Sequence, residues 1–442
     1  MIDWKSVSEE AGRLLSGYLK IRSLNPPGDE SEAAAYLARA LEERGLTSEL
    51  YESAPKRMNL ISRLPGDGTK RGIVLYNHMD VVAADPRDWS RDPFSGDISG
   101  GFVYGRGAID MKGMAVMQIL AMDLLNRLNP RRTRDVIFFA AADEEKGGRF
   151  GAQWLIENHW DKIQAEYLWD EGGFGMRDLF GPGTVFLSAV AEKQDLWLRV
   201  TARGTPGHSG IPRGDNAAET LVRALDRILK INSWYRLHPV VRDMFAGAAR
   251  VMPFPKSLVA SALGNPLAFR IARPALAANP TISAMLRDTI SVTVLEAGEK
   301  ENIIPDKAQA VLDIRLLPDQ DPGEFLDRLD RIIGDDRVRV EPIQSPTPGA
   351  PSRTDTEFYR TLSETLSRCA PGSVTAPMLT PGTTDSCHFR RKGVQCYGLF
   401  PAILDPGELD RFHGIDERIS LDNLGLGTRV VYETLAALVE GN

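Results

Sequence analysis

The sequence predicts an α/β fold in which an αβα domain with a mixed sheet is interrupted by a smaller α+β domain, called the lid domain here. Three observations support this prediction. Through residues 1–190, apolar segments of strand length alternate with segments of helical periodicity. Residues 191–344 change to the order strand, helix, strand, strand, helix, strand, which is typical of a ferredoxin-like unit. Residues 345–442 return to the first pattern, so we expect them to complete the first domain.

The elements of the first segment follow from its periodicity. A helical pattern runs to about Leu24, where Asn25-Pro26-Pro27-Gly28 interrupts it. The apolar run at 135–140 is typical of a strand that is covered on both faces. The predicted helices are those ending near 24, at 30–44, directly after Asp110 and at 151–158, and the predicted strands are 47–52, 59–64, 72–76, 135–140 and 165–169.

The remaining two segments are predicted in the same way. An insert at about 232–287, rich in Ala, Pro, Leu and Met, predicts several short helices that cover the lid and the cleft. Residues 344–349 form a return linker between the domains. The lid strands are 195–202, 290–296, 308–316 and 337–342 with helices after 210 and at 325–333, and the last segment has helices 356–367 and 422–440 with strand 394–400.

Composition excludes several classes of partner. A net charge of −7 gives no basic footprint, so we expect no nucleic-acid partner. No apolar run approaches the ~20 residues of a membrane span, and the N-terminus lacks the apolar core of a signal peptide. The three cysteines, Cys369, Cys387 and Cys396, form no CxxC pair, which suits a reducing compartment. The sequence therefore predicts a cytoplasmic protein without a membrane partner.

Histidine and acidic residues recur where predicted strands end. His78 and Asp80 follow the strand at 72–76, and similar positions downstream carry further acids. Taken singly, each of these residues has a simpler interpretation, such as a solvated acid after a strand. Together they are typical of a two-metal hydrolase, in which a carboxylate bridges two cations ~3.5–4 Å apart. The other candidates are Asp110, the pairs Glu144-Glu145 and Asp170-Glu171, and His413 in His413-Gly414-Ile415-Asp416-Glu417.

The types of these residues indicate the chemistry. Imidazole and carboxylate ligands without cysteine suit zinc, with cobalt or manganese also compatible. Such a site lowers the pKa of bound water to ~7. A base outside the metal ligands must then take the proton, and the Glu144-Glu145 pair offers one carboxylate for each task. Asp80 can hold the second ring N–H of His78 and fix its tautomer.

These motifs resemble those of the zinc-dependent metallopeptidase family of aminoacylase, carboxypeptidase S, glutamate carboxypeptidase, acetylornithine deacetylase and succinyl-diaminopimelate desuccinylase. The resemblance covers nearly the whole chain and is greatest to the aminoacylase and carboxypeptidase S branch. It implies that Asp110 bridges two metal ions and that Glu144 is the general base. It further implies that His78 and either Asp170 or Glu171 bind one ion, that Glu145 and His413 bind the other, and that Asp80 orients His78.

Two features limit this transfer. Relatives with a Gly-Glu-Pro at the fourth-ligand motif align Glu171 with the ligand, so Glu171 is preferred and Asp170 is kept. The usual proline soon after the first motif is Ala83 here, which affects the loop more than the metal chemistry.

The resemblance also assigns residues of the lid. His208, in Gly204-Thr205-Pro206-Gly207-His208-Ser209-Gly210, resembles a lid histidine that completes an oxyanion site. Asn302 and Arg315 resemble residues that bind a substrate carboxylate, and Gly382 and Thr383 supply further hydrogen bonds. A salt bridge from Arg315 to Asp313 or Asp306 is an equal alternative. In dimeric relatives the lid histidine reaches the partner's metals, which implies a homodimer through the lid.

The predicted function is a two-metal hydrolase that cleaves the amide bond of N-acyl amino acids or small peptides with a free carboxylate. One alternative is a dizinc aminopeptidase, which needs an acid in place of Arg315 to bind a free amine. The other alternative is a catalytically silent binding or scaffold protein of the same fold. The intact set of candidate ligands together with Glu144 argues against the silent protein.

Overall fold

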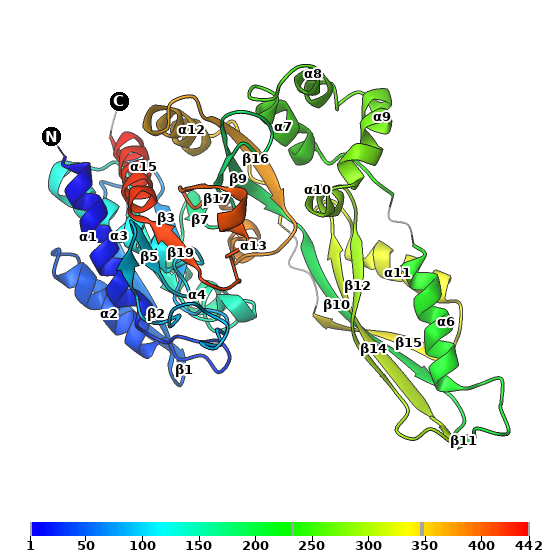
Figure 1. Ribbon diagram of the computed structural model, residues 1–442. Helices are drawn as coiled ribbons and strands as arrows, with labels where there is room; N and C mark the ends of the chain where they lie inside the picture. Colours follow the sequence, from blue (N-terminus) through cyan, green and yellow to red (C-terminus); the bar gives the residue numbers. More distant parts are fainter. Residues whose placement is uncertain (1, 232–233, 345–348, 441–442) are drawn as a thin grey trace.

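The computed structural model describes residues 2–231, 234–344 and 349–440 (Figure 1). Its larger sheet has ten strands in the order β1-β2-β6-β3-β7-β17-β9-β8-β18, with β16 paired to β9. Strands β6, β3, β7 and β17 are parallel, whereas β1 pairs antiparallel with β2, β2 with β6 and β8 with β9, so the predicted mixed sheet is confirmed. The strands are β1 (Ser48–Ala54), β2 (Arg57–Leu64), β3 (Ile73–His78), β6 (Val136–Ala141), β7 (Tyr167–Asp170), β8 (Gly175–Arg177), β9 (Thr184–Glu192), β16 (Val374–Thr380), β17 (Gln395–Gly398) and β18 (Ile403–Leu404).

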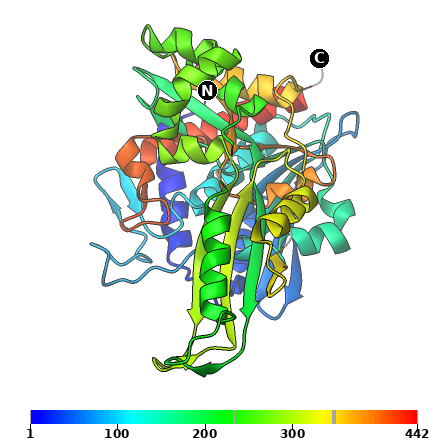
Figure 2. The same cartoon turned by 90° about the vertical axis from the view of Figure 1, so that its right-hand side faces the viewer.

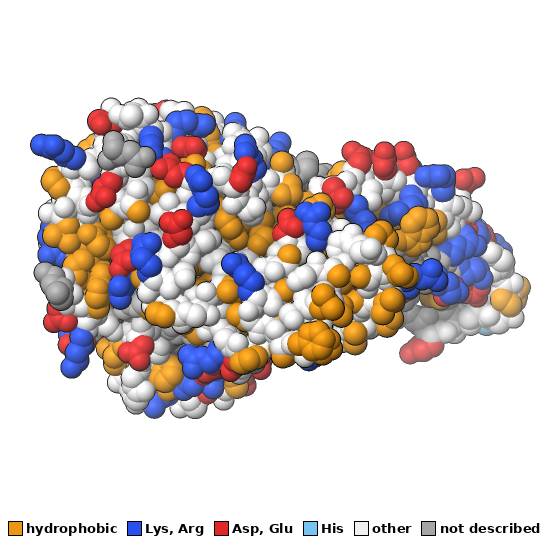
Figure 3. All heavy atoms as spheres, turned by 90° about the horizontal axis from the view of Figure 1, so that it is seen from above, with side chains coloured by type: hydrophobic (Ala, Val, Ile, Leu, Met, Phe, Trp, Pro, Cys, Tyr) orange, Lys and Arg blue, Asp and Glu red, His pale blue; other side chains and the backbone are white. Residues whose placement is uncertain are grey.

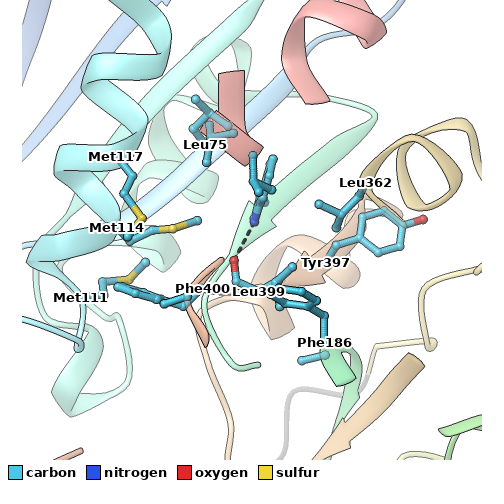
Figure 4. Close-up of a cluster of buried hydrophobic side chains, with 14 of the residues drawn as sticks. Leu75, Met111, Met114, Met117, Phe186, Leu362, Tyr397, Leu399 and Phe400 are labelled. Carbon is cyan, nitrogen blue, oxygen red and sulfur yellow. Dashed lines mark hydrogen bonds between the residues drawn. The ribbon is translucent and has the colours of Figure 1, made fainter. Parts of the chain in front are cut away.

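Helices cover both faces of this sheet. Successive side chains of β3 point to opposite faces, so Ile73 and Leu75 join one core while Val74 and Tyr76 join another. Figure 4 shows part of the first core, where methionines of α3 lie near Leu75 and Phe400. The first face carries α1 (Trp4–Leu19), α2 (Ser31–Glu42), α3 (Lys112–Leu128), α12 (Glu357–Cys369) and α15 (Leu421–Val439), and the second carries α4 (Ala152–Asn158), α5 (Trp160–Ile163) and α13 (Ser386–Arg390).

Several elements differ from those expected. Helix α1 ends at Leu19 rather than near Leu24, because Leu24 pairs with Val81 in an isolated bridge. Strands β9 and β16 were not predicted. Strand β16 contains Pro377, and it tolerates the missing N–H because it pairs only with β9 among the described residues.

The smaller unit has the predicted ferredoxin-like order. Its antiparallel sheet runs β12-β14-β10-β15, formed by Thr289–Ala297, Lys307–Leu316, Gln194–Arg203 and Val338–Gln344. Two helices, α6 (Ala217–Leu229) and α11 (Pro322–Ile333), pack on it and share a separate hydrophobic core (Figure 2). At its tip, far from the larger sheet, β11 (Gly207–His208) pairs with β13 (Ile303–Ile304) (Figure 1).

The insert contains helices α7 (Pro239–Ala248), α8 (Lys256–Ser261), α9 (Pro266–Ala277) and α10 (Pro280–Met285). Its α7 packs against β16 and β9, and Met244 and Phe245 belong to the core of the larger unit. The predicted position of the insert over the cleft is confirmed, because Met244, Phe245 and Met285 line a cavity there. The predicted cover of the lid is not found, because no described insert residue joins the buried core of the smaller sheet. The start of the predicted insert at 232–233 and the linker at 345–348 lie outside the described residues.

A short sheet joins the two segments of the larger unit. Strand β19 (Arg418–Ser420) pairs with β5 (Phe102–Tyr104), which pairs with β4 (Ile98–Ser99). This pairing brings the loop before β19 next to the loop that precedes α3. Among the described helices, none is long and apolar enough to cross a membrane. The cytoplasmic location stays a prediction.

Candidate metal centre

Five candidate ligands meet at one edge of the larger sheet. His78 is the last residue of β3, and Glu171 follows β7 directly. Glu145 lies in a 3-10 turn, Glu144–Lys146, that begins three residues after β6. Because these three strands are parallel, their carboxyl ends deliver the side chains to the same place. Asp110 precedes α3, and His413 lies before β19.

Asp110 is shared by two groups of side chains. Its Oδ1 lies 3.0 Å from Nε2 of His78, which is 3.5 Å from Oε1 of Glu171. Its Oδ2 lies 2.6 Å from Nε2 of His413, which is 3.6 Å from Oε2 of Glu145. Within each group the ligand atoms lie within 4.8 Å of one another. One carboxylate with an oxygen facing each group is the arrangement that a bridging ligand requires.

The residues present fit a pair of divalent cations. Oε1 of Glu145 is buried and has no hydrogen-bond partner among the described residues. Burial raises the pKa of Glu171 well above its usual range, and the nearby charge of Asp110 raises it further. Such crowding of carboxylates is compensated when cations lie between them. The donors are imidazole nitrogens and carboxylate oxygens, which suit zinc, cobalt or manganese.

Asp80 contacts His78 in a different way from the one expected. The backbone oxygen of Asp80 lies 2.9 Å from Nδ1 of His78, whereas its carboxylate Oδ1 is 3.5 Å away. The carbonyl therefore accepts the N–H of Nδ1, which leaves the lone pair of Nε2 free to coordinate a cation. The carboxylate instead accepts hydrogen bonds from the backbone N–H groups of Glu144 and Glu145, both at 3.2 Å. Asn25 Nδ2 donates to the same carboxylate at 2.8 Å.

Glu417 fixes the loop that carries Asp110. Its fully buried carboxylate accepts the backbone N–H groups of Ile109 at 2.7 Å and of Asp110 at 3.1 Å. It also pairs with Arg106 at 2.6 Å, and Arg106 donates to the carbonyl of Gly414 at 2.8 Å. The late segment thus both carries His413 and shapes the loop of Asp110. The sequence motif contained Glu417 but gave no sign of this role.

The choice between Asp170 and Glu171 follows from hydrogen bonding. Asp170 Oδ2 accepts hydroxyl hydrogen bonds from Ser386 at 2.6 Å and Thr384 at 2.9 Å. Its Oδ1 accepts the N–H of Glu171 at 2.7 Å. Both oxygens of Asp170 are therefore engaged away from the histidines. The geometry favours Glu171 over Asp170 as a candidate ligand, and assigns Asp170 to the support of the following loop.

Glu144 lies beside the two groups without belonging to either. Its Oε2 is 4.0 Å from Nε2 of His78, and its side chain lines the adjoining cavity. Burial raises the pKa of Glu144 well above its usual range, and the charges of Glu171, Asp385 and Glu145 raise it further. A carboxylate that gains a proton this readily has the property required of a group that accepts and releases protons.

A cavity of about 970 Å³ opens beside these residues. It is lined at one end by the candidate ligands, and Arg315, Gly382 and Thr383 also contact it. Much of the remaining wall is apolar and comes from the larger unit and the insert. The larger unit contributes Phe174, Phe180 and Met378, and the insert contributes Met244, Phe245 and Met285.

Arg315 is already engaged by two carboxylates. Its Nε lies 2.8 Å from Asp313 Oδ1, its Nη2 lies 3.2 Å from Asp313 Oδ2, and its Nη1 pairs with Asp195. A longer contact of 3.3 Å joins Nη1 to the hydroxyl of Thr383. The salt-bridge alternative is thus present, with Asp195 in place of Asp306. Of five N–H donors, one on Nη2 has no recorded partner in the described chain.

His208 and Asn302 do not lie with the other candidates. His208 is exposed at the tip of the smaller unit, where its Nδ1 accepts the N–H of Gly210 at 3.0 Å. The backbone oxygen of Asn302 accepts the N–H of Ser209 at 3.1 Å, so both residues belong to the same turn region. Neither residue lines the cavity of this chain. Sequence motifs show which residues are present but not how far a hairpin extends from the rest of the fold.

Two residues of the site were missed. Asp385 lines the cavity and accepts a hydrogen bond from the hydroxyl of Tyr76. Burial raises the pKa of Asp385 to about 8, while the hydrogen bond from Tyr76 lowers it. The polar run Gly382-Thr383-Thr384-Asp385-Ser386 was the available signal. Tyr76 gave no signal, because its pattern is that of a buried strand residue.

Comparison with known proteins shows the family of the chain. The family model described as peptidase family M20/M25/M40 matches residues 74–437. The N-fatty-acyl-amino acid synthase/hydrolase of Homo sapiens is 29% identical over 401 residues, which cover 87% of this chain and 78% of that protein. Aminoacylase-1 of Homo sapiens is 28% identical over 415 residues, covering 92% and 90%.

Among solved structures, an M20 family metallo-carboxypeptidase from Sulfolobus solfataricus has a TM-score of 0.73. That match covers 97% of this chain and 98% of the other at 20% identity, and it supports the fold alone.

Proposed function

The chain belongs to peptidase family M20/M25/M40 and is a metallopeptidase or amidohydrolase of that family, and from this premise we propose its reaction. We propose that it hydrolyses the amide bond of N-acyl amino acids or small peptides that carry a free carboxylate. The observation that carries the proposal is the shared position of Asp110 between two ligand groups, beside a cavity that Glu144 also lines. A silent scaffold protein has no need of such an arrangement.

We propose that His78, Asp110 and Glu171 hold one divalent cation and that Asp110, Glu145 and His413 hold the other, with zinc preferred. When bound, the cations supply Lewis acidity and lower the pKa of water. Glu144 is then the general base, which takes a proton from the attacking water and delivers it to the leaving amine nitrogen. The hydrogen bonds of Asp80 to the backbone of Glu144 and Glu145 support this role, because they fix the turn that carries both side chains.

The substrate carboxylate is assigned to Arg315, Thr383 and Gly382. All three contact the cavity on the side of the smaller unit. Arg315 retains one N–H on Nη2, and the hydroxyl of Thr383 donates to Asp195, so a bound carboxylate must replace part of this network. The apolar wall then takes the acyl group. The printed names of the relatives, N-fatty-acyl-amino acid synthase/hydrolase and aminoacylase, support substrates of this kind.

His208 and Asn302 are assigned to the site of a partner subunit. Both lie at the exposed tip of the smaller unit, so they complete a site only if a second copy of the chain brings them to it. We therefore propose a homodimer through residues 191–344, with 1–190 and 345–442 as the catalytic domain. In such a dimer His208 stabilises the oxyanion of the partner's tetrahedral intermediate.

A panel of substrates tests this function. Purified enzyme is incubated with N-acetyl, N-octanoyl and N-palmitoyl amino acids, the matching amino acid amides and unblocked dipeptides, and free amine is measured. Release of free amino acid from the N-acyl acids, with much slower cleavage of their amides, is expected. Cleavage of none of these compounds by the metal-loaded enzyme contradicts the proposal.

One observation favours a second candidate function. Asp195 lines the cavity next to Arg315, and a carboxylate in that position is suited to a free amine. A dizinc aminopeptidase is therefore the alternative. Faster cleavage of unblocked dipeptides than of their N-acetyl forms in the same panel identifies it.

A further inference from the structure

The helical insert presents an apolar surface that the proposed reaction does not use. Ten of the twelve residues of α9 are apolar, the other two are Arg270 and Arg273, and none is buried. Its inner side packs through Phe269, Ala272 and Leu276 against the larger core. Its outer side carries Leu267 and Ile271, four residues apart and therefore on one face, with exposed fractions of 65% and 72%.

This apolar face continues onto the neighbouring helix. Four residues separate α8 from α9, and both lie at the same end of the molecule in Figures 1 and 2. Phe254, just before α8, is 82% exposed, and Leu258 within α8 is also exposed. Figure 3 shows hydrophobic side chains gathered on this end of the molecule. A large exposed apolar surface of this kind marks a site of contact with a partner or a lipid surface.

The charge of the insert differs in sign from that of the whole chain. Residues 234–287 contain seven lysines and arginines but one acid, Asp243, whereas the whole chain has a net charge of −7. Lys256, Arg270 and Arg273 are exposed on the two helices that carry the apolar face. Apolar residues flanked by Lys and Arg are typical of helices that lie in the boundary of an anionic lipid surface.

We propose that the outer face of α8 and α9 docks on an anionic lipid surface. Leu267, Ile271 and Phe254 enter the boundary between head groups and acyl chains, while Arg270 and Arg273 contact anionic head groups. The proposal goes beyond the hydrolytic reaction and does not depend on it. Docking in this way brings the catalytic cavity close to the lipid surface, because Asn279 and Ile282, just after α9, line that cavity.

A second copy of the chain is the less suitable occupant of this face. In a two-fold contact the same surface meets itself, so the excess of basic residues on one insert faces the same excess on the other. Like charges in that arrangement oppose association. An anionic lipid surface supplies the opposite charge together with an apolar interior.

Vesicle sedimentation tests the proposal. The full chain is mixed with vesicles of phosphatidylcholine alone or with phosphatidylglycerol, at low and at 0.5 M salt. Binding to the phosphatidylglycerol vesicles is expected, with a partial loss at high salt because charge contacts are screened. The double variant Leu267→Asp and Ile271→Asp should bind at least ten-fold more weakly. A matched control, Leu50→Asp and Leu128→Asp, adds the same charge at exposed positions far from the insert and should bind like the original protein.

Two further readouts make the result decisive. Both double variants should keep the circular dichroism spectrum, the melting temperature within a few degrees and the hydrolysis rate on a short-chain N-acyl amino acid, since these residues lie outside the cavity. Absence of binding to every vesicle overturns the proposal, and so does equal loss in both double variants. Loss of an oligomer in the insert variant, without any vesicle binding by the original chain, assigns the face to a second copy instead.

Discussion

The metal edge of the larger sheet and the tip of the smaller unit carry candidate residues for the same reaction, but they are built in opposite ways. At the metal edge, His78 is fully buried and Asp110 is nearly so. The backbone oxygen of Asp80 holds the ring of His78, and the distant Glu417 accepts the backbone N–H of Asp110. At the tip, His208 is exposed, and among the described residues its ring has a hydrogen bond only with the neighbouring backbone N–H of Gly210.

The difference indicates what each region needs. The metal edge contains buried carboxylates whose charges oppose one another, so we propose that cations rather than a protein surface complete it. The tip has no such crowding and lies far from the larger sheet, so we propose that a second protein surface completes it (Figure 1). Four variants test whether the two regions have these different roles. They follow from the largest expected effect to the smallest.

Glu144→Gln is expected to lower kcat by ~10²–10⁴-fold, the usual contribution of a general base. The variant should bind as much metal as the original protein, because Glu144 lies outside both ligand groups. Measurement of metal content beside the rate separates the two roles. Loss of one metal ion per chain makes Glu144 a ligand and removes it as the base.

Glu417→Gln is expected to lower the free energy of unfolding by ~3–5 kcal/mol, because it leaves the buried guanidinium of Arg106 without its partner charge. Urea denaturation of the metal-loaded protein measures the change. The matched control is Glu219→Gln, which breaks an exposed pair with Arg223 and should cost less than ~1 kcal/mol. A cost for Glu417→Gln as small as that of the control contradicts its role in shaping the Asp110 loop.

His208→Ala is expected to lower kcat by ~10²–10³-fold, as for loss of one oxyanion donor. If His208 acts in the partner's site, mixing this variant with Glu144→Ala under subunit exchange restores activity. One site of each mixed dimer then contains both lesions and the other is intact. If verified mixed dimers regain no activity, His208 acts in the site of its own chain. That outcome would contradict the proposal, which places His208 in the partner's site.

Arg315→Lys is expected to raise the activation free energy for hydrolysis of free-acid substrates by ~1.5–3 kcal/mol. Lysine keeps the charge but loses the two parallel N–H groups with which a guanidinium binds a carboxylate. The corresponding amides should be affected much less. The ratio of kcat/KM for the acid to kcat/KM for the amide therefore measures how Arg315 binds the substrate carboxylate, apart from any effect on its pairing with Asp195. Equal losses on both substrates leave Arg315 with a purely structural role.

The fold and the metal edge could be predicted because they depend on local pattern and on strand direction. The buried strand before His78 and the acids after β6 and β7 are visible in the sequence, and parallel strands then bring them together. The role of the Asp80 carboxylate was not visible, because its hydrogen bonds go to backbone N–H groups that carry no sequence signal.

Long-range packing accounts for the other differences. Apolar composition showed that the insert must be covered, but not that α7 packs on β16 rather than on the lid. Likewise, the pairing of Arg315 with Asp195 depends on the register of β10 against β14, in which these two residues lie opposite each other. Such register is set by the whole sheet and not by either segment alone.

Metal removal and return test the central proposal most directly. The protein is treated with a chelator, dialysed and titrated with Zn²⁺ while hydrolysis of an N-acyl amino acid and bound metal are followed together. We expect activity to be lost on removal and to return as up to two ions bind per chain. The melting temperature should rise with the metal, because ligands that bind only the folded state stabilise it by ~4 kcal/mol at a thousand times Kd. Full activity in protein shown to contain no metal would contradict the two-metal account.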